Sequence, residues 1–262
     1  MTDQAPKMPR RDFLDTAVRK LPAWLLVFKL LNPAELLGDG DSTDVGNPKY
    51  DPTQHDYAMG VNVHKCIGCG RCADACKTEN NVPRDPIYFR TWVERYITST
   101  DGETQVDSPN GGINGFPPAQ KESGILRTFF VPKLCNHCSK PPCVQVCPVG
   151  ATFQSRDGVV LVDETYCVGC RYCIQACPYG ARYLHPIKKI ADKCTFCYHR
   201  VVKGHVPACV EVCPTQARVF GEAGQQSSPL RRFLRFNDVT VLKSWLNTKP
   251  KVYYAGADGE VR

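Results

Sequence analysis

The feature that most constrains this chain is the arrangement of its sixteen cysteines, which fall into four groups of four with none left over. The first and third groups share the spacing C-x2-C-x2-C-x3-C, at Cys66, Cys69, Cys72, Cys76 and at Cys167, Cys170, Cys173, Cys177. The second and fourth groups lengthen only the middle gap, at Cys135, Cys138, Cys143, Cys147 and at Cys194, Cys197, Cys209, Cys213. Any fold of this chain must therefore form short loops that bring several thiols together.

Ligation of iron–sulfur clusters explains this spacing, because bacterial ferredoxins hold [4Fe–4S] clusters with the same run of cysteines. Three cysteines on a tight loop bind one cluster, and the fourth, at the start of a helix, binds the neighbouring cluster. Inside the loops lie Gly68, Gly70 and Gly169, where a side chain would obstruct the approach of the backbone to the sulfides. A proline follows the fourth cysteine in three groups, at Pro148, Pro178 and Pro214, but Lys77 follows Cys76, so the first group is less regular.

Three alternative roles for the cysteines agree less well with the sequence. A disulfide framework is typical of secreted domains much shorter than 262 residues, and a C-x2-C pair in every group is poor geometry for many disulfides at once. Structural zinc also uses paired C-x2-C, but three thiolates crowded on one loop suit three corners of a cluster better than one tetrahedral ion. Inert buried thiols would not repeat in this pattern.

The length of the linkers predicts which groups share clusters. Nineteen residues separate Cys147 from Cys167, close to the layout of two-cluster ferredoxins, so groups two and three are expected to pair and, by elimination, groups one and four. The predicted ligand sets are named here quartets 1 to 4. They are quartet 1 (Cys66, Cys69, Cys72, Cys213), quartet 2 (Cys194, Cys197, Cys209, Cys76), quartet 3 (Cys135, Cys138, Cys143, Cys177) and quartet 4 (Cys167, Cys170, Cys173, Cys147).

The net charge and composition fit a protein rich in clusters. The formal charge is +7 with neutral thiols, which alone is compatible with nucleic-acid binding. Sixteen thiolates and four oxidised cores of roughly +2 each would change this to about −1, so the basic residues mainly offset the clusters. Twenty glycines and 21 prolines predict a loop-rich fold, in which clusters crosslink segments that an apolar core would otherwise hold.

Residues 1–38 differ from the rest of the chain. The run PRRDFL, with Arg10 and Arg11, resembles the twin-arginine export signal, which is read by a translocase that moves folded proteins. The apolar stretch that follows is interrupted by Pro22 and Lys29 and is too short for a predicted transmembrane helix. The alternative is an amphipathic helix that anchors the chain on a partner or membrane surface. Residues 39–56 are polar and are predicted to be a linker.

The predicted fold class is α+β, loop-rich, with two ferredoxin-like double-cluster modules, one nested in the other. Residues 57–133 and 188–221 would form the module of groups one and four. Residues 134–187 would form the inserted module of groups two and three, and residues 222–262 a C-terminal extension. This division follows directly from the predicted pairing of the groups.

Local patterns predict the elements around the cysteines. Strands are expected at 61–63, 88–96, 126–131, 158–163 and 251–254, and a helix at about 230–246. Residues 99–124, which are rich in Gly, Ser, Thr and Asp, are expected to be a surface insertion, either an interface loop or a solvated one. The segments that begin at Cys147, Cys177 and Cys213 repeat one pattern, Cys-Pro-x-x-Ala, and each predicts a helix end, a turn and a strand.

No other motif points to chemistry. His137, in Cys135-Asn-His-Cys138, could ligate metal, but four cysteines are already present, so a supporting or surface role is expected. The six histidines have no metal-ligand spacing, and there is no G-x-G-x-x-G, P-loop or catalytic triad pattern. The sequence therefore contains no recognisable substrate-binding motif.

The order of the groups and three phrases of the sequence are distinctive. The phrases are Cys66-Ile-Gly-Cys-Gly-Arg-Cys, Cys135-Asn-His-Cys-Ser-Lys-Pro-Pro-Cys and Cys167-Val-Gly-Cys-Arg-Tyr-Cys. With the long middle gap of the fourth group, they resemble the four-cluster electron-transfer subunits of molybdopterin oxidoreductases, such as polysulfide, tetrathionate and dimethyl sulfoxide reductases. The resemblance covers residues 57–221. Because all sixteen cysteines are present, it implies four [4Fe–4S] clusters.

The resemblance also implies partners and a location. Members of this family are non-catalytic subunits, which relay single electrons between a molybdopterin-type catalytic subunit or a multi-haem cytochrome and an integral membrane subunit that reacts with quinone. A protein of this kind with an export signal is expected on the periplasmic or extracytoplasmic face of the cytoplasmic membrane, as a peripheral member of a hetero-oligomer. The alternatives are a freestanding soluble polyferredoxin and a zinc-scaffold interaction protein.

Overall fold

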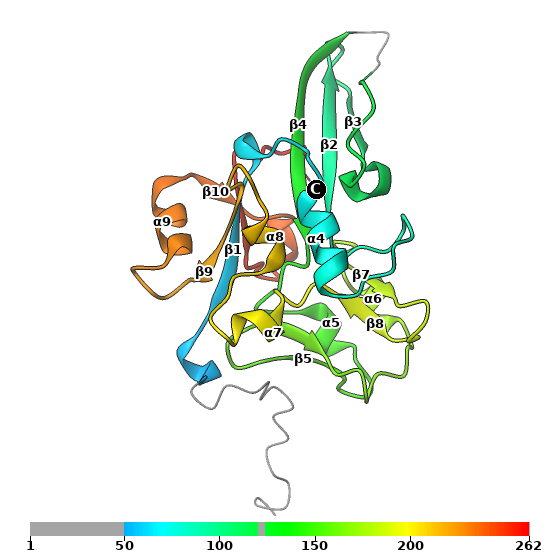
Figure 1. Cartoon of the computed structure of the whole chain (residues 1–262), viewed down its shortest axis with the longest axis vertical. Helices are drawn as coiled ribbons and strands as arrows, with labels where there is room; N and C mark the ends of the chain where they lie inside the picture. Colours follow the sequence, from blue (N-terminus) through cyan, green and yellow to red (C-terminus); the bar gives the residue numbers. More distant parts are fainter. Residues whose placement is uncertain (1–49, 120–123, 262) are drawn as a thin grey trace, which may run out of the picture. The chain divides into compact units, whose positions relative to one another are not determined.

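The computed structural model describes residues 50–119 and 124–261, which belong to one compact unit that begins at Val45. The expected signal or anchor at 1–38 and most of the expected linker lie outside the described residues. Within the described residues, no helix has the length and apolar character needed to cross a membrane. Helices and strands are mixed and mostly short, as the sequence predicts, and long loops connect them (Figure 1).

A four-stranded sheet joins the beginning and the end of the described residues, in the order β10-β11-β1-β9. Its strands are β1 (Tyr57–Asn62), β9 (Arg218–Glu222), β10 (Val239–Thr240) and β11 (Val252–Ala255). Strand β1 is parallel to β11 and antiparallel to β9. Helix α9 (Pro229–Phe236) packs on this sheet, because Leu230 and Phe233 are buried against Ala58 and Ala255.

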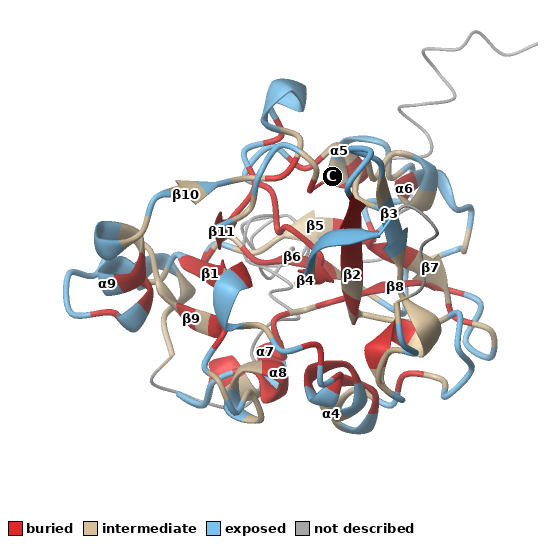
Figure 2. Cartoon of the chain, turned by 90° about the horizontal axis from the view of Figure 1, so that it is seen from above, coloured by how far each residue is buried: buried red, intermediate tan, exposed pale blue. Residues whose placement is uncertain are grey.

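A second sheet contains the two longest strands, β2 and β4, in the order β3-β2-β4, and forms the tall ribbon of Figure 1. Its strands are β2 (Thr91–Ser99), β3 (Thr104–Asp107) and β4 (Ile125–Leu134), and all pairs are antiparallel. Figure 2 shows buried residues along β1 and β2, where Met59, Val61 and Val93 belong to the main apolar core. The main apolar core therefore lies where β1 and β2 meet the loops that carry the cysteines.

The remaining elements are short and lie around the cysteines. Two hairpins are formed by β5 (Thr152–Gln154) with β6 (Val160–Val162) and by β7 (Arg182–Leu184) with β8 (Ala191–Lys193). The helices are α4 (Arg71–Glu79), α5 (Pro142–Gln145), α6 (Tyr172–Gln175), α7 (Tyr198–Val201) and α8 (Ala208–Glu211). Single 3₁₀ turns occur at η1 (Pro52–Gln54), η2 (Val63–Lys65), η3 (Pro109–Gly112) and η4 (Ser244–Leu246).

Several predicted elements are confirmed. Strands β4, β6 and β11 occupy the expected positions, and each Cys-Pro repeat has a helical turn before it and a strand after it. The helices α5, α6 and α8 have four residues each, whereas α4 has nine. The irregular first group explains this difference, because Lys77 stands where the other groups have a proline that cannot continue a helix.

Other expectations about the elements are wrong in part. The first strand is β1 at Tyr57–Asn62, not 61–63, and the second runs from Thr91 to Ser99, not 88–96. The helix expected at 230–246 ends at Phe236, because the backbone of Asn237 is extended and the chain continues into β10. The insertion at 99–124 is not simply a loop, because β3 pairs with β2 inside it.

Candidate metal centres

All sixteen cysteines are free thiols, so the disulfide framework is wrong. Among the described residues, no three His, Cys, Asp or Glu side chains are placed so that they could hold one metal ion. The thiols nevertheless gather in neighbourhoods, which suits a larger group that keeps its ligands further apart.

The thiols of quartet 1 line one small pocket. Cys66 and Cys69 come from the loop between η2 and α4, Cys72 from the first turn of α4, and Cys213 from the turn between α8 and β9. Burial, together with the thiolates of Cys72 and Cys213, raises the pKa of Cys66 to about 11. Cys69 is exposed, so this neighbourhood reaches the protein surface.

The thiols of quartet 2 are all buried. The side-chain amide nitrogen of Asn80 lies 3.6 Å from Sγ of Cys76 and 3.5 Å from Sγ of Cys197, so α4 and the fourth group meet here. Burial raises the pKa of Cys76 well above its ordinary value, and the thiolates of Cys194, Cys209 and Cys197 raise it too. Assembly of a metal group must therefore supply positive charge to keep these sulfurs ionised.

The thiols of quartet 3 are also close to one another. Burial raises the pKa of Cys138 to about 12, and among the further causes are the thiolates of Cys135, Cys143 and Cys177. Three of the four side chains are buried, and only Cys177 is partly exposed. The fold thus places Cys177 of the third group beside the thiols of the second group.

The thiols of quartet 4 are the least completely gathered. Cys167 and Cys173 contact the same small apolar cluster, which contains Val160 and Ala191. The backbone amide of Thr152 donates a hydrogen bond to Sγ of Cys147 at 3.4 Å, so the described contact of this thiol lies within its own turn. Cys170 is exposed, and this quartet also reaches the surface.

Two buried arginines that the sequence did not single out contact the thiols. Arg218 donates to Sγ of Cys72 at 3.4 Å and to Sγ of Cys209 at 3.8 Å, and Arg182 donates to Sγ of Cys143 at 3.1 Å. Burial alone would lower the pKa of each guanidinium group, but the cysteine thiolates raise it, and the net direction is upward. The sequence repeat could have pointed to both arginines, since each lies five residues after the fourth cysteine of its group.

Lys193 is a third buried cation next to the cysteines. Its ammonium group donates to the backbone carbonyls of Val160 and Cys194, and its side chain is almost completely buried. Burial lowers its pKa, the thiolates of Cys135 and Cys194 raise it, and the net direction is downward. Cys135 and Cys194 belong to different predicted quartets, so Lys193 lies where two of them approach each other.

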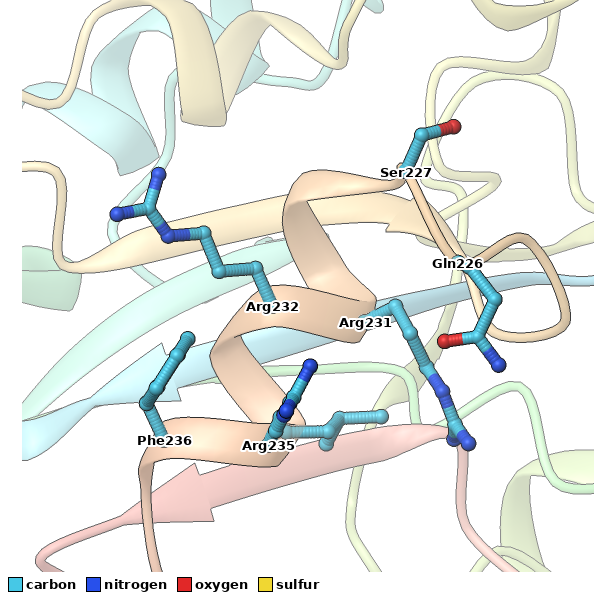
Figure 3. A pocket seen from close by; sticks show the side chains of 7 residues that line it. Gln226, Ser227, Arg231, Arg232, Arg235 and Phe236 are labelled. Carbon is cyan, nitrogen blue, oxygen red and sulfur yellow. The ribbon is translucent and has the colours of Figure 1, made fainter.

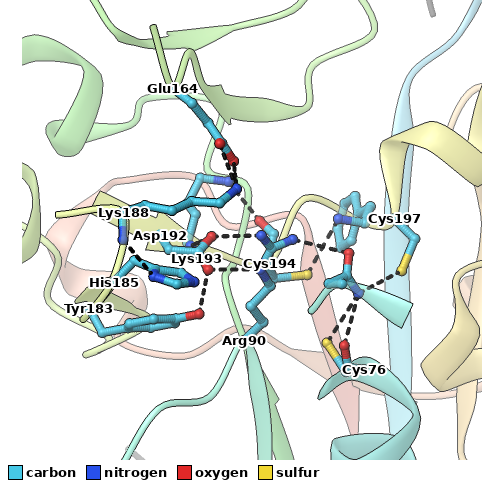
Figure 4. Close-up of polar contacts among 12 residues, drawn as sticks. Cys76, Arg90, Glu164, Tyr183, His185, Lys188, Asp192, Lys193, Cys194 and Cys197 are labelled. Atoms are coloured by element: carbon cyan, nitrogen blue, oxygen red, sulfur yellow. Dashed lines mark hydrogen bonds and ion pairs between the residues drawn. The ribbon is translucent and has the colours of Figure 1, made fainter. Parts of the chain in front are cut away.

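A polar network leads from quartet 2 to the residue before Lys193. Arg90 donates to the side-chain oxygen of Asn80 at 3.0 Å and forms an ion pair with Asp192 at 2.8 Å. The hydroxyl group of Tyr183 donates to the same Asp192 carboxylate. Figure 4 shows Arg90 between Asp192 on one side and Cys76 and Cys197 on the other. This network fixes the segment that carries Lys193 against the end of α4.

His137 is buried completely, so a surface role is wrong. Its Nδ1 accepts a hydrogen bond from the amide of Val160 at 3.1 Å, and its ring stacks on Phe196 with centroids 3.7 Å apart. His137 and Phe196 occupy the same position in the C-x2-C loops of groups two and four. The ring therefore joins two cysteine loops, which is a supporting role.

A surface pocket on α9 offers different chemistry. It is lined by Gln226, Ser227, Arg231, Arg232, Leu234, Arg235 and Phe236. Figure 3 shows the three arginine side chains projecting from α9. Guanidinium groups bind carboxylates and phosphates, but none of the lining residues is a cysteine, so this pocket is separate from the thiol sites.

The described residues fit a sulfur-rich metal group. Buried nitrogen atoms without a hydrogen-bond partner in the described residues include Nε of Arg182, Nε of Arg218 and Nε2 of His137. Each belongs to a residue that contacts or adjoins a cysteine, and the sulfides and thiolates of an iron–sulfur cluster accept hydrogen bonds. A donor set of thiolates with cations and N–H groups around it is the chemistry that such clusters require.

Comparison with known protein families gives the class of this protein. Residues 126–223 match one 4Fe-4S dicluster domain model, and residues 65–151 match a second 4Fe-4S dicluster domain model. The protein is therefore an iron–sulfur protein with two dicluster domains, which together account for four [4Fe–4S] clusters and sixteen cysteines.

Known relatives give the family. The chain is 42% identical over 207 residues to a tetrathionate reductase subunit of Salmonella typhimurium, covering 78% of this chain and 74% of the relative. It is 44% identical to a tetrathionate reductase subunit of Archaeoglobus fulgidus, covering 78% and 83%. It is 36% identical to one of the polysulfide reductase chains of Wolinella succinogenes, covering 75% and 92%. This protein belongs to the family of four-cluster iron–sulfur subunits of the polysulfide, tetrathionate and dimethyl sulfoxide reductase type.

Proposed function

We propose that this protein is a non-catalytic electron-transfer subunit that relays single electrons through four [4Fe–4S] clusters within a respiratory complex. When bound, each cluster supplies a one-electron carrier. The observation that carries the proposal is the graded burial of the thiols: quartets 2 and 3 are buried almost entirely, whereas quartets 1 and 4 each have an exposed cysteine, Cys69 and Cys170. Buried carriers between two exposed ones are what passage across a subunit requires.

We assign the four clusters to quartets 1 to 4 as defined from the sequence. The proximity of Cys76 to Cys197 supports quartet 2, and the shared pocket of Cys66 and Cys213 supports quartet 1. This assignment nests the module of groups two and three inside the module of groups one and four. Strand pairing is compatible with it, because β1 before the first group pairs with β9 after the fourth.

The residues of the protein itself have three tasks in this function. The cysteine loops hold the clusters in fixed positions, and buried apolar residues such as Val93, Val160 and Phe196 exclude water from the neighbourhoods of the cysteines. Buried cations and N–H groups offset the negative charge of the thiolates, which tunes the reduction potentials. No bond to a substrate is made or broken by any of these residues.

For the partners, we propose a molybdopterin-type catalytic subunit or a multi-haem cytochrome on one side and an integral membrane, quinone-reactive subunit on the other. The names of the relatives support a hetero-oligomer, because they denote subunits of reductases. They favour this function over a freestanding soluble polyferredoxin. We further propose a peripheral location on the extracytoplasmic face of the cytoplasmic membrane, which rests on Arg10 and Arg11 alone.

The central test is anaerobic purification followed by metal analysis. We expect brown protein with about sixteen irons and as many acid-labile sulfides per chain, and one-electron reduction by dithionite. In the Cys143→Ser variant, one cluster should change in the paramagnetic resonance spectrum while quartets 1 and 2 keep their signals. Colourless protein with zinc would refute the function, and loss of the signals of quartets 1 and 2 in the variant would refute the assignment.

A further inference from the structure

Arg218 lies between two predicted quartets. One of its terminal nitrogens is 3.8 Å from Sγ of Cys209, and the other is 3.4 Å from Sγ of Cys72. Cys72 belongs to quartet 1 and Cys209 to quartet 2. The hydroxyl group of Thr91 accepts a further hydrogen bond from Arg218 at 2.7 Å, which fixes the guanidinium group in this position.

Arg182 has the same place in the other pair of quartets. It donates to Sγ of Cys143, a member of quartet 3, and to the hydroxyl group of Thr152 at 3.3 Å. Cys143 is buried in one cluster with Cys173 of quartet 4, against which Cys167 of the same quartet packs, so quartet 4 lies close to the thiol that Arg182 contacts. The two arginines are equivalent in the Cys-Pro-x-x-Ala-Arg repeat, so the repeat places one guanidinium group within each pair of quartets.

Lys193 lies between the two pairs of quartets, where quartet 2 approaches quartet 3. Its ammonium group donates to the carbonyl of Cys194, a member of quartet 2, and to the carbonyl of Val160, which packs in one apolar cluster with Cys143 of quartet 3. The thiolates of Cys135, Cys143 and Cys194 also act on its charge. All three cations are buried, with exposed fractions of 5% for Arg182, 1% for Lys193 and 2% for Arg218. Buried cations without an anion are costly, so each needs negative charge from its surroundings.

We propose that Arg218, Lys193 and Arg182 are inter-cluster cations, each shared by two neighbouring quartets, in the order quartet 1, Arg218, quartet 2, Lys193, quartet 3, Arg182, quartet 4. The inference rests on the proposed function, because it needs clusters in these quartets. A [4Fe–4S] cluster with four thiolates changes from about −2 to about −3 when it accepts one electron, with no proton taken up. A fixed cation between two clusters stabilises the added charge on either of them.

Sharing of the cations predicts which clusters change their reduction potential when one cation is removed. Quartets 2 and 3 each adjoin two cations, whereas quartets 1 and 4 each adjoin one. Removal of one cation should therefore lower the reduction potentials of two clusters and leave the other two unchanged. A cation that served only to pack the fold would not sort the clusters in this way.

The experiment is a redox titration of the holoprotein with dithionite, followed by paramagnetic resonance, on Arg218→Gln, Lys193→Met and Arg182→Gln. We expect Arg218→Gln and Arg182→Gln to shift two different clusters each, and Lys193→Met to shift one cluster from each of those pairs. The expected loss is about tenfold in the one-electron reduction equilibrium, or about 59 mV. Arg218→Lys and Arg182→Lys, which keep the charge, should restore most of it.

The control is Arg127→Gln, because Arg127 is an exposed residue of β4 that pairs with Asp258 and Glu260. The reduction potentials of all four clusters in Arg127→Gln should equal those of the wild type. The proposal is overturned if a cation variant with full iron and sulfide shifts no cluster, only one, or all four equally. A wild type without four clusters would instead overturn the proposed function.

If an arginine variant loses its clusters, the redox titration is carried out on a threonine variant instead. Thr91→Val and Thr152→Val remove the hydroxyl groups that hold Arg218 and Arg182, while the charges remain. A smaller shift in the same two clusters would support the proposal, and unchanged potentials would overturn it.

Discussion

One difference between the C-x2-C loops of the outer quartets (1 and 4) and those of the inner quartets (2 and 3) is the residue before the second cysteine. All four residues have a positive φ: 70° at Gly68, 40° at His137, 70° at Gly169 and 55° at Phe196. The outer loops use glycine, which adopts this conformation without cost, whereas the inner loops use residues for which it is strained by about 1–2 kcal/mol. The stacking of His137 on Phe196 accounts for this choice, because it joins the two inner loops.

The surroundings of the loops differ in the same way. The outer loops present apolar side chains to solvent, with exposed fractions of 59% at Ile67 and 66% at Val168, next to the exposed Cys69 and Cys170. The inner loops are covered by the main core. The comparison teaches that one ligand spacing, C-x2-C, can lie at the surface or inside the core, and that the residues between the cysteines differ accordingly.

The largest expected difference between inner and outer quartets is in the number of clusters lost when one cysteine ligand is replaced. Cys170→Ser removes an exposed thiol of quartet 4, and we expect a folded protein that keeps about twelve irons, because only one cluster depends on it. Cys194→Ser removes a buried thiol next to Cys135, and we expect loss of more than one cluster together with loss of soluble protein. Iron and sulfide analysis of anaerobic preparations measures both. Equal losses in the two variants would show that inner and outer quartets do not differ.

A second difference concerns the outer glycines. Gly169 has a positive φ, and an added Cβ would lie 2.3 Å from the carbonyl oxygen of Lys189, so Gly169→Ala must displace the backbone of the loop. We expect this variant to lose the cluster of quartet 4, as seen by iron content and paramagnetic resonance. Gly150→Ala is the matched control, because Gly150 has a similar φ of 68° but no atom within 4 Å of the added Cβ. It should cost about 1–2 kcal/mol and keep all clusters; cluster loss in both would mean that φ alone matters.

The sequence predicted the cysteine loops and their flanking elements well, because ligand spacing and the Cys-Pro-x-x-Ala repeat are local signals. It did not predict the roles of Arg182, Arg218 and Lys193, since their contacts join segments far apart in the chain. The sequence shows that His137 and Phe196 stand where the other loops have glycine, but it did not predict that their rings stack, because this contact is tertiary.

The C-terminal helix was predicted too long for a related reason. Its apolar pattern continues to Leu246, but Val239 and Thr240 pair with Ala255 and Tyr254 of β11, and strand pairing overrides the local preference. The predicted pairing of the quartets and the module boundaries stay predictions, which the cysteine and cation variants test.

The smallest expected effect isolates the contact that distinguishes the inner loops. Phe196→Leu and His137→Leu each remove the ring stack, so a double-mutant cycle gives the coupling of the two inner loops, expected at about 1 kcal/mol. The measurement is the rate at which cluster absorbance disappears in guanidinium under anaerobic conditions. A coupling of this size corresponds to about fivefold in rate. The exposed Phe236→Leu serves as the control and should leave the rate unchanged, since Phe236 is 71% exposed. Additive effects in the cycle would mean that contacts other than the ring stack compensate the strain at His137 and Phe196. Burial alone would then distinguish the inner loops from the outer loops.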